Sequence, residues 1–223
     1  MSKIQLKNTE LFDLAHTRCE KQLRSVTFPW EALAHIGEWI TEIGKGLDGE
    51  SYVQIAPDIW VARSAKVAPS AALFGPCIIG EGAEVRHCAF IRGNALVGDG
   101  AVVGNSTELK NVILFDGVQV PHYNYVGDSI LGYRAHLGAG AITSNVKGDK
   151  SAVMIKYGDT CIETGRKKVG AFLGDHAEIG CGCVLNPGTV VGKDTQVYPL
   201  CAVRGVLPAG VIFKAPGSVV ERK

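Results

Sequence analysis

The sequence predicts an all-β solenoid, a parallel β-helix in which each turn of the coil contains three short strands. Two observations carry this prediction: large apolar residues recur every six positions, and small residues precede them by two positions. A third is the presence of 28 glycines in 223 residues, which indicates many turns. One strand and one corner in each six residues is typical of hexapeptide solenoids, so one coil takes about 18 residues.

The repeat starts near residue 61 and continues without a break for ten steps of six residues. Its members are Val61, Val67, Leu73, Ile79, Val85, Ile91, Val97, Val103, Leu109 and Phe115. Ala65 and Ala71 lie two residues before the next member, so both side chains point to the same side of a short strand. The period resumes at Leu173, Ile179, Leu185, Val191, Val197 and Val203. We expect both sets to fill one interior, each side chain contributing about 1.5–3 kcal/mol.

Residues 1–50 lack this period. Apolar residues recur at helical spacing between Pro29, which suits a first turn, and the glycines at 44 and 46, which suit a helix end. A weaker helix is expected over residues 11–23. Because a solenoid exposes core and strand edge at its ends, we predict an N-terminal helical cap over 1–50. Residues 51–223 would then be the β-helix domain, finished by a C-terminal cap.

Residues 146–168 interrupt the column. The apolar period stops there and charge rises, which predicts a loop or hairpin projecting from the column. The segment is locally basic, with Lys147, Lys150, Arg166, Lys167 and Lys168. A solvated loop and an anion-binding loop both remain open.

Composition excludes several classes of partner. With 23 Lys and Arg against 22 Asp and Glu, the net charge of +1 gives no bulk attraction to nucleic acid or an anionic membrane. No apolar run approaches the roughly 20 residues that span a bilayer. Seven cysteines without a C-x-x-C pair, and an N-terminus without a secretory signal, favour a cytoplasmic protein.

A pair of basic residues suggests an anion site. Arg92 and Lys110 are 18 residues apart, one coil, so they should stack on one corner about 4.8 Å from each other. Two like charges at that separation are unfavourable unless an anion lies between them, and a phosphate would suit. The alternative is two solvated surface cations.

The stretch VPHYNYVGDSILG, residues 120–132, is where the period slips. Phe115 to Val120 is five residues, and a second five-residue step follows Val126; slips of this kind re-aim side chains. His122 and Tyr125 lie beside the slip. Glu108 could hold the imidazole in one tautomer and leave its other nitrogen to accept a proton. We interpret His122 as a candidate general base; a structural histidine is the alternative.

The runs GNSTELK, VPHYNYVGDS and LGAGAITSN resemble a known family. They are similar to the acetyltransferase domain of the bifunctional N-acetylglucosamine-1-phosphate uridyltransferase/glucosamine-1-phosphate acetyltransferases and to archaeal sugar-1-phosphate nucleotidylyltransferases with an acetyltransferase tail. The resemblance implies a left-handed β-helix, an acetyl-CoA-dependent N-acetyltransferase acting on an amino sugar 1-phosphate, and a homotrimer with CoA between chains. No metal is expected in the acyl-transfer site.

The resemblance also implies roles for single residues. Arg92 and Lys110 would bind the substrate phosphate, and Glu108 would orient the base His122. The other substrate contacts would be Tyr125, Asn145, His136 in place of a family Asn, and Lys150 as an approximate counterpart of a family Lys. Acetyl-CoA would lie near Ala139, Gly140, Ala141 and Cys181, the last in place of a family Ser. Only about 50 residues precede the column, without a glycine-rich nucleotide loop, so we expect no nucleotidylyltransferase activity.

Two alternatives come from other functional classes. A non-catalytic module that binds a sugar phosphate or nucleotide sugar, or that partners a separate nucleotidylyltransferase, would need Arg92 and Lys110 but not His122. A trimeric zinc carbonic anhydrase on the same architecture would use His87, His122 and His136, although their spacing differs from that family.

Overall fold

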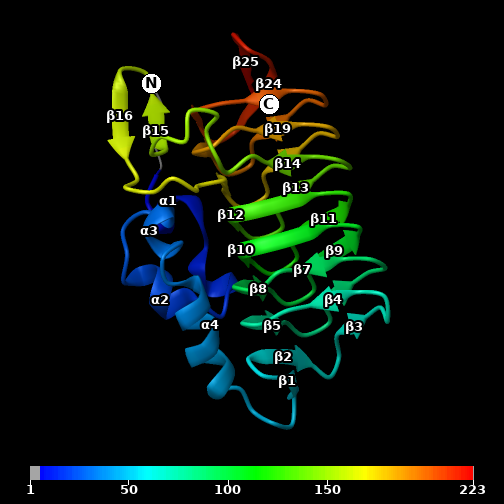
Figure 1. Ribbon diagram of the computed structural model, residues 1–223. Helices are drawn as coiled ribbons and strands as arrows, with labels where there is room; N and C mark the ends of the chain where they lie inside the picture. The colour runs from blue at the N-terminus through cyan, green and yellow to red at the C-terminus, as the bar shows by residue number, and fades with distance from the viewer. Residues whose placement is uncertain (1–5, 223) are drawn as a thin grey trace.

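The computed structural model describes residues 6–222. As predicted, its main body is a left-handed parallel β-helix of hexapeptide repeats, wound as a three-sided column (Figure 1). We call its sides walls 1, 2 and 3, in the order in which the chain reaches them.

Each wall is a parallel stack of short strands. Wall 1 contains β2 (Ile59–Ala62), β5 (Cys77–Ile79), β8 (Ala95–Val97), β17 (Ala171–Leu173), β20 (Thr189–Val191) and β23 (Val206–Leu207). Wall 2 contains β3 (Lys66–Val67), β6 (Glu84–Val85), β9 (Val102–Asn105), β11 (Gln119–His122), β13 (His136–Leu137), β18 (Glu178–Ile179), β21 (Gln196–Val197) and β24 (Val211–Ala215). Wall 3 contains β4 (Ala72–Leu73), β7 (Phe90–Ile91), β14 (Ile142–Thr143), β19 (Val184–Leu185) and β22 (Ala202–Val203).

Two longer strands connect walls 3 and 1. β10 (Glu108–Leu114) and β12 (Tyr125–Leu131) begin on wall 3 and end on wall 1, so they join the two walls into one sheet. At the ends of the column, β1 (Tyr52–Ala56) pairs antiparallel with β2, and β25 (Ser218–Glu221) pairs antiparallel with β24.

The interior follows the six-residue period, with one exception. Val97 pairs with Leu114, and Leu114 pairs with Leu131, so the interior residue is Leu114 and not Phe115. The ring of Phe115 instead lies 5.1 Å from that of Phe12, in the N-terminal segment. The prediction was wrong here because two large apolar residues are adjacent, and the second is covered by another part of the chain.

The first five-residue step therefore lies between Leu109 and Leu114, earlier than the spacing suggested. Ile91 pairs with Leu109 at an offset of 18 residues, whereas Val97 pairs with Leu114 at an offset of 17. Asn111 (φ 56°) and Asp128 (φ 49°) adopt left-handed backbone at this corner, a conformation that Asn and Asp tolerate better than most residues. The irregularity thus moves to the 3–1 corner, where wall 3 turns into wall 1 at residues 92–94, 110–111 and 127–128.

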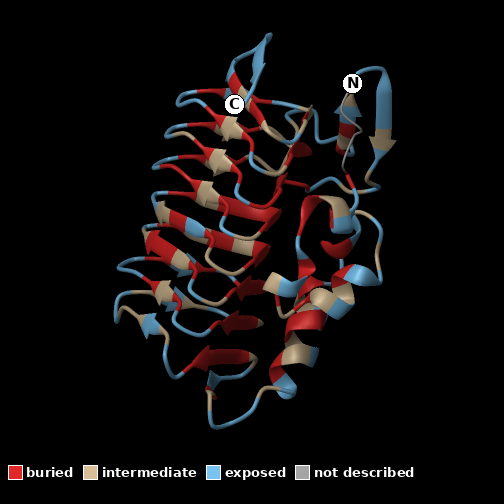
Figure 2. Cartoon of the chain, turned by 180° about the vertical axis from the view of Figure 1, so that it is seen from behind, coloured by how far each residue is buried: buried red, intermediate tan, exposed pale blue. Residues whose placement is uncertain are grey.

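The N-terminal helices lie along wall 1 rather than over an end, so the predicted position of the cap is wrong (Figures 1 and 2). They are α1 (Asn8–Leu11), η1 (Leu14–His16), α2 (Glu20–Arg24), α3 (Pro29–Ala32) and α4 (Ile36–Lys45), and α4 contacts β5, β8 and β10. Wall 1 needs this cover because its outward residues are also large and apolar. They include Ile78, Leu96, Ile113, Ile130 and Phe172, all at most 1% exposed.

Polar contacts fix the N-terminal segment at the far edge of wall 1. The backbone N–H of Asp13 donates to the Asp175 carboxylate at 2.7 Å. Arg18 donates to both carboxylate oxygens of Asp99 at 3.1 Å and also contacts Glu81. The segment therefore crosses wall 1 from one corner to the other.

Residues 146–168 project from the 3–1 corner and contain an antiparallel hairpin of β15 (Met154–Tyr157) and β16 (Thr160–Glu163) (Figure 1). The projecting hairpin is the form expected from the sequence. β15 contacts β23, so the hairpin covers wall 1 beyond the helices. Among residues 6–222, none of the helices has the length and hydropathy needed to span a bilayer.

Candidate functional site

A buried carboxylate organises the 3–1 corner. Asp128 is 2% exposed, and its two carboxylate oxygens lie 3.0 and 3.3 Å from the Lys110 ammonium nitrogen. It also accepts hydrogen bonds from the side-chain amides of Asn111 (2.9 Å) and Asn145 (2.6 Å). Asn145 is 3.2 Å from the Tyr125 hydroxyl. Three predicted site residues thus share one network, which we call the Asp128 network.

The Tyr125 hydroxyl is held in its neutral form. Burial raises the pKa of Tyr125, and the hydrogen bond from Asn145 opposes that shift in part. A neutral phenol at the edge of wall 3 can donate a hydrogen bond to a substrate oxygen.

Arg92 and Lys110 lie one coil apart on the same wall, as their spacing predicts. Each follows a member of the Ile91–Leu109 pair. However, each cation has its own carboxylate: the Arg92 guanidinium lies 2.7 Å from Glu108, which raises the pKa of Arg92, and Lys110 contacts Asp128. A phosphate is therefore not required to relieve repulsion between these two cations.

His122 lies at the 2–3 corner, where wall 2 turns into wall 3, and is exposed. Its carbonyl accepts a hydrogen bond from the Gly140 N–H at 3.0 Å. Within residues 6–222 its ring makes no hydrogen bond or ion pair, and Glu108 contacts Arg92 instead. A single chain thus does not form the expected Glu108–His122 contact.

The residues predicted to lie near acetyl-CoA share the corner of His122. The Gly182 N–H donates to the Ala139 carbonyl at 2.8 Å, so Ala139 and Gly140 stack between His122 and Cys181. Cys181 is exposed and Ala141 is buried. The backbone and thiol at this corner are therefore grouped as the sequence resemblance implies.

His136 and Lys150 are not part of the Asp128 network. His136 lies on wall 2, where its ring nitrogen is 2.8 Å from Glu178. Lys150 is exposed in the projecting segment. The described part of the chain contains no group of three or more His, Cys, Asp or Glu side chains placed to hold a metal, and His87 lies against Ser70 instead.

Sequence reasoning missed Asp128 and Asn111. Both lie at the short step, which the period placed elsewhere. The available signal was a Gly-Asp pair 17 and 18 residues after Lys110, because a register of 17 puts Asp128 beside Asn111.

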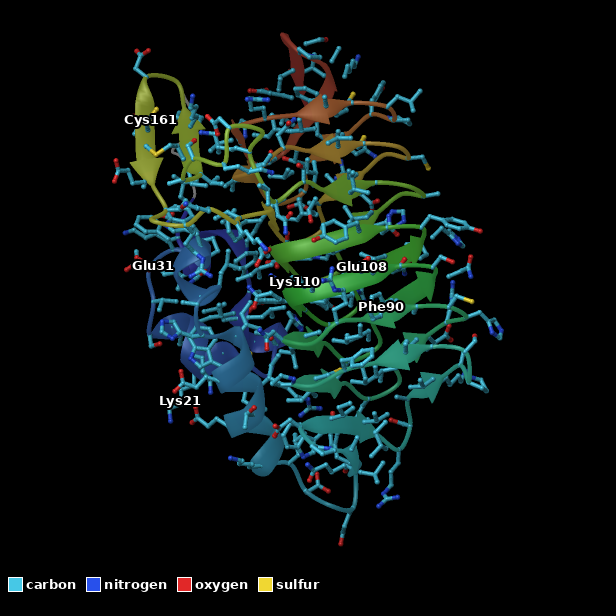
Figure 3. The ribbon with its side chains drawn as sticks, viewed as in Figure 1. Lys21, Glu31, Phe90, Glu108, Lys110 and Cys161 are labelled. Atoms are coloured by element: carbon cyan, nitrogen blue, oxygen red, sulfur yellow. The ribbon has the colours of Figure 1, made fainter. Side chains whose placement is uncertain are left out.

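A cleft of about 470 Å³ opens beside this network. It is lined by Leu33 and Ala34 of the N-terminal segment, by Lys110 and Asp128, and by residues 165–168 of the projecting segment. Figure 3 shows Lys110 on the side of β10 that faces the helices, and Glu108 further from them. Three separate parts of the chain therefore meet at Lys110.

Comparison with known proteins agrees with the sequence motifs. Residues 73–162 match the family described as GMPPB C-terminal domain. A bifunctional protein GlmU from Methanococcus aeolicus is 32% identical over 207 residues, covering 84% of this chain and 50% of that protein. A bifunctional sugar-1-phosphate nucleotidylyltransferase/acetyltransferase from Sulfurisphaera tokodaii is 33% identical over 112 residues, covering 50% of this chain and 28% of that protein.

Among solved structures, a mutant of perosamine N-acetyltransferase from Caulobacter crescentus, in complex with CoA and GDP-perosamine, shares 21% identity with a TM-score of 0.39. It covers 74% of this chain and 56% of that chain. The chain spans half or less of the length of the two curated relatives described above. The predicted resemblance is confirmed: this hexapeptide-repeat β-helix is similar to the bifunctional nucleotidylyltransferase/acetyltransferases.

Proposed function

We propose that this chain is an acetyl-CoA-dependent N-acetyltransferase whose acceptor is an amino sugar carrying phosphate on its first carbon. The observation that carries the proposal is the Asp128 network, which holds Lys110, Tyr125 and Asn145 together on wall 3. Similarity to the bifunctional acetyltransferases supports it.

In this mechanism, His122 takes a proton from the substrate ammonium group. The free amine attacks the thioester carbonyl carbon and forms the new C–N bond, while the backbone N–H groups near Ala139–Ala141 stabilise the oxyanion. The C–S bond then breaks, and CoA leaves as a thiolate that takes up a proton. No acyl-enzyme and no metal take part.

The acting unit in this proposal is a homotrimer in the cytoplasm. His122 lies at the 2–3 corner and His136 on wall 2, so one chain does not bring them to Lys110. The helices and the hairpin cover wall 1, which leaves walls 2 and 3 open to neighbouring chains. All seven cysteines are free, which supports a reducing compartment.

A direct test is the release of CoA thiol from acetyl-CoA, measured across amino sugar 1-phosphates and nucleotide-linked amino sugars. We expect at least one acceptor to react, and His122→Ala to lower kcat by about 10²–10⁴-fold, the usual contribution of a general base. Absence of release with every acceptor, in a folded and assembled protein, would overturn the proposal.

A non-catalytic binding module remains the second candidate. The contact between Glu108 and Arg92 favours it, since the carboxylate is then engaged by a cation and not by His122. In that case the same amino sugars would bind at equilibrium without any thiol release.

A further inference from the structure

The cleft beside Lys110 carries an excess of positive charge. Lys110, Arg166, Lys167 and Lys168 line it, against the single carboxylate of Asp128. Within residues 6–222, no carboxylate lies within 4.0 Å of the charged ends of Arg166, Lys167 or Lys168. Three neighbouring cations without an acidic partner repel each other, and a bound anion would relieve that repulsion.

One donor in the cleft wall has no acceptor. The Nε–H of Arg166 is buried and makes no hydrogen bond, while an Nη of the same guanidinium lies 3.4 Å from the Leu33 carbonyl oxygen. Buried donors are nearly always paired, so an unpaired guanidinium N–H in a cleft indicates an acceptor supplied by a ligand. A guanidinium suits phosphate oxygens because its donors match their geometry.

The size and charge of the cleft fit more than one phosphate. Its volume of about 470 Å³ lies within the range typical of small-molecule sites. Four cations against one carboxylate leave a surplus that a monophosphate would only partly neutralise. A diphosphate places two adjacent anionic groups along the row from Lys110 to Lys168.

We infer that this cleft binds the diphosphate of a nucleotide-linked amino sugar, so that the acceptor is a nucleoside diphosphate sugar rather than a free sugar 1-phosphate. The inference rests on the proposed function for the identity of the sugar. CoA also carries a diphosphate, but the residues expected near acetyl-CoA lie at the 2–3 corner, across wall 3 from this cleft. Residues 33–34 and 165–168 would thereby select the class of acceptor.

Calorimetric titration of the full chain with inorganic pyrophosphate, UDP, GDP and CoA tests the inference. We expect pyrophosphate and at least one nucleoside diphosphate to bind the wild-type protein, and both Arg166→Gln and the double variant Lys167→Gln/Lys168→Gln to weaken that binding at least tenfold. CoA binding should change less than twofold. Lys156→Gln, an exposed lysine on β15 outside the cleft, is the matched control and should bind as the wild type does.

Three results would overturn the inference: no binding of pyrophosphate or nucleoside diphosphate to the wild type, equal binding by the cleft variants, or loss of CoA binding in their place. Lys167 and Lys168 are exposed, so the double variant reports on the cleft even where Arg166→Gln weakens the contact with Leu33. His122→Ala should retain diphosphate binding. Diphosphate binding without acetyl transfer would therefore contradict the proposed function alone.

Discussion

Single residues at the 3–1 corner determine what this protein can bind. Asp128 is buried and accepts hydrogen bonds from three side chains, so it fixes the position of Lys110 more firmly than a surface ion pair would. By contrast, the Arg92–Glu108 pair is largely exposed, at 48% and 31% of the two side chains. The two cations predicted as a pair therefore differ in mobility and in role.

Glu108→Gln separates stability from catalysis. An exposed ion pair contributes about 0–1 kcal/mol, so we expect the free energy of unfolding to change by less than about 1 kcal/mol. If Glu108 orients His122 in the assembled enzyme, kcat should fall at least tenfold while KM changes little. Urea unfolding and steady-state kinetics measure the two effects, with Glu84→Gln, on wall 2, as the control for a lost surface ion pair. Unchanged kcat would remove Glu108 from the mechanism.

Buried thiols give the fold an alkaline limit. Burial raises the pKa of Cys77 to about 12, whereas the thiol of an unfolded chain ionises near 8.5. Because the unfolded state loses its proton first, the stability from the neutral thiol is complete below about pH 8.5 and declines as pH rises towards 12.

We expect the unfolding free energy of the wild type to fall more steeply than that of Cys77→Ala between pH 8 and 11. The difference should reach at most about 3 kcal/mol after the values at pH 7 are subtracted. Denaturant titrations at each pH measure it. Cys88→Ala, at an exposed thiol, should follow the wild-type slope. Parallel slopes for wild type and Cys77→Ala would contradict the prediction.

At the scale of elements, the main feature is that helices cover one wall of the column. Gly44 makes this possible, because a Cβ at that position would lie 2.3–2.5 Å from the ring of Trp60. Gly46, two residues later, has open space, with Ile43 O as the nearest atom at 3.5 Å. The two glycines that the sequence marked as a helix end therefore have different functions.

Gly44→Ala should destabilise the protein by about 1–3 kcal/mol, the usual cost of overpacking, although alanine favours a helix. Gly46→Ala is the matched control and should change stability by less than about 1 kcal/mol in either direction. Thermal or urea unfolding measures both, and Trp60 fluorescence reports on the contact. Equal effects of the two substitutions would show that α4 does not need the close approach.

Much of the column could be predicted from the sequence, because the interior repeats every six residues and each repeat obeys the same packing rule. The position of the helices was not predicted, although Cys77–Ile79 and Ala95–Val97 contain three consecutive apolar residues. An apolar middle residue in such a run points outward and needs a cover. Asp128 was missed for a related reason, since a one-residue change of register is set by packing and not by spacing.

For the whole molecule, the arrangement of the candidate residues favours assembly. His122 and His136 lie at different places on the column, and a single chain leaves walls 2 and 3 open. Light scattering coupled to size-exclusion chromatography should give about three times the chain mass of 23.7 kDa. A monomer that retains full activity would contradict the trimer.

Mixed assemblies test whether one site takes residues from two chains. Chains carrying His122→Ala and chains carrying His136→Ala should each be impaired, and unfolding and refolding them together should restore activity. In random trimers about a quarter of the interfaces then hold both native histidines. No recovery on mixing, with trimers verified by mass, would place both histidines in the same chain's site or outside the mechanism.

The Leu33 carbonyl oxygen accepts hydrogen bonds from Asn111 and from Arg166, which are 78 and 133 residues further along the chain. The column itself can grow coil by coil as the ribosome delivers it, because each coil rests on the one before. The anion cleft has no such gradual route. It exists only after residue 168 has been synthesised and has returned to meet a segment made near the start of translation, so a nascent chain stalled earlier would fold much of its column without a ligand site.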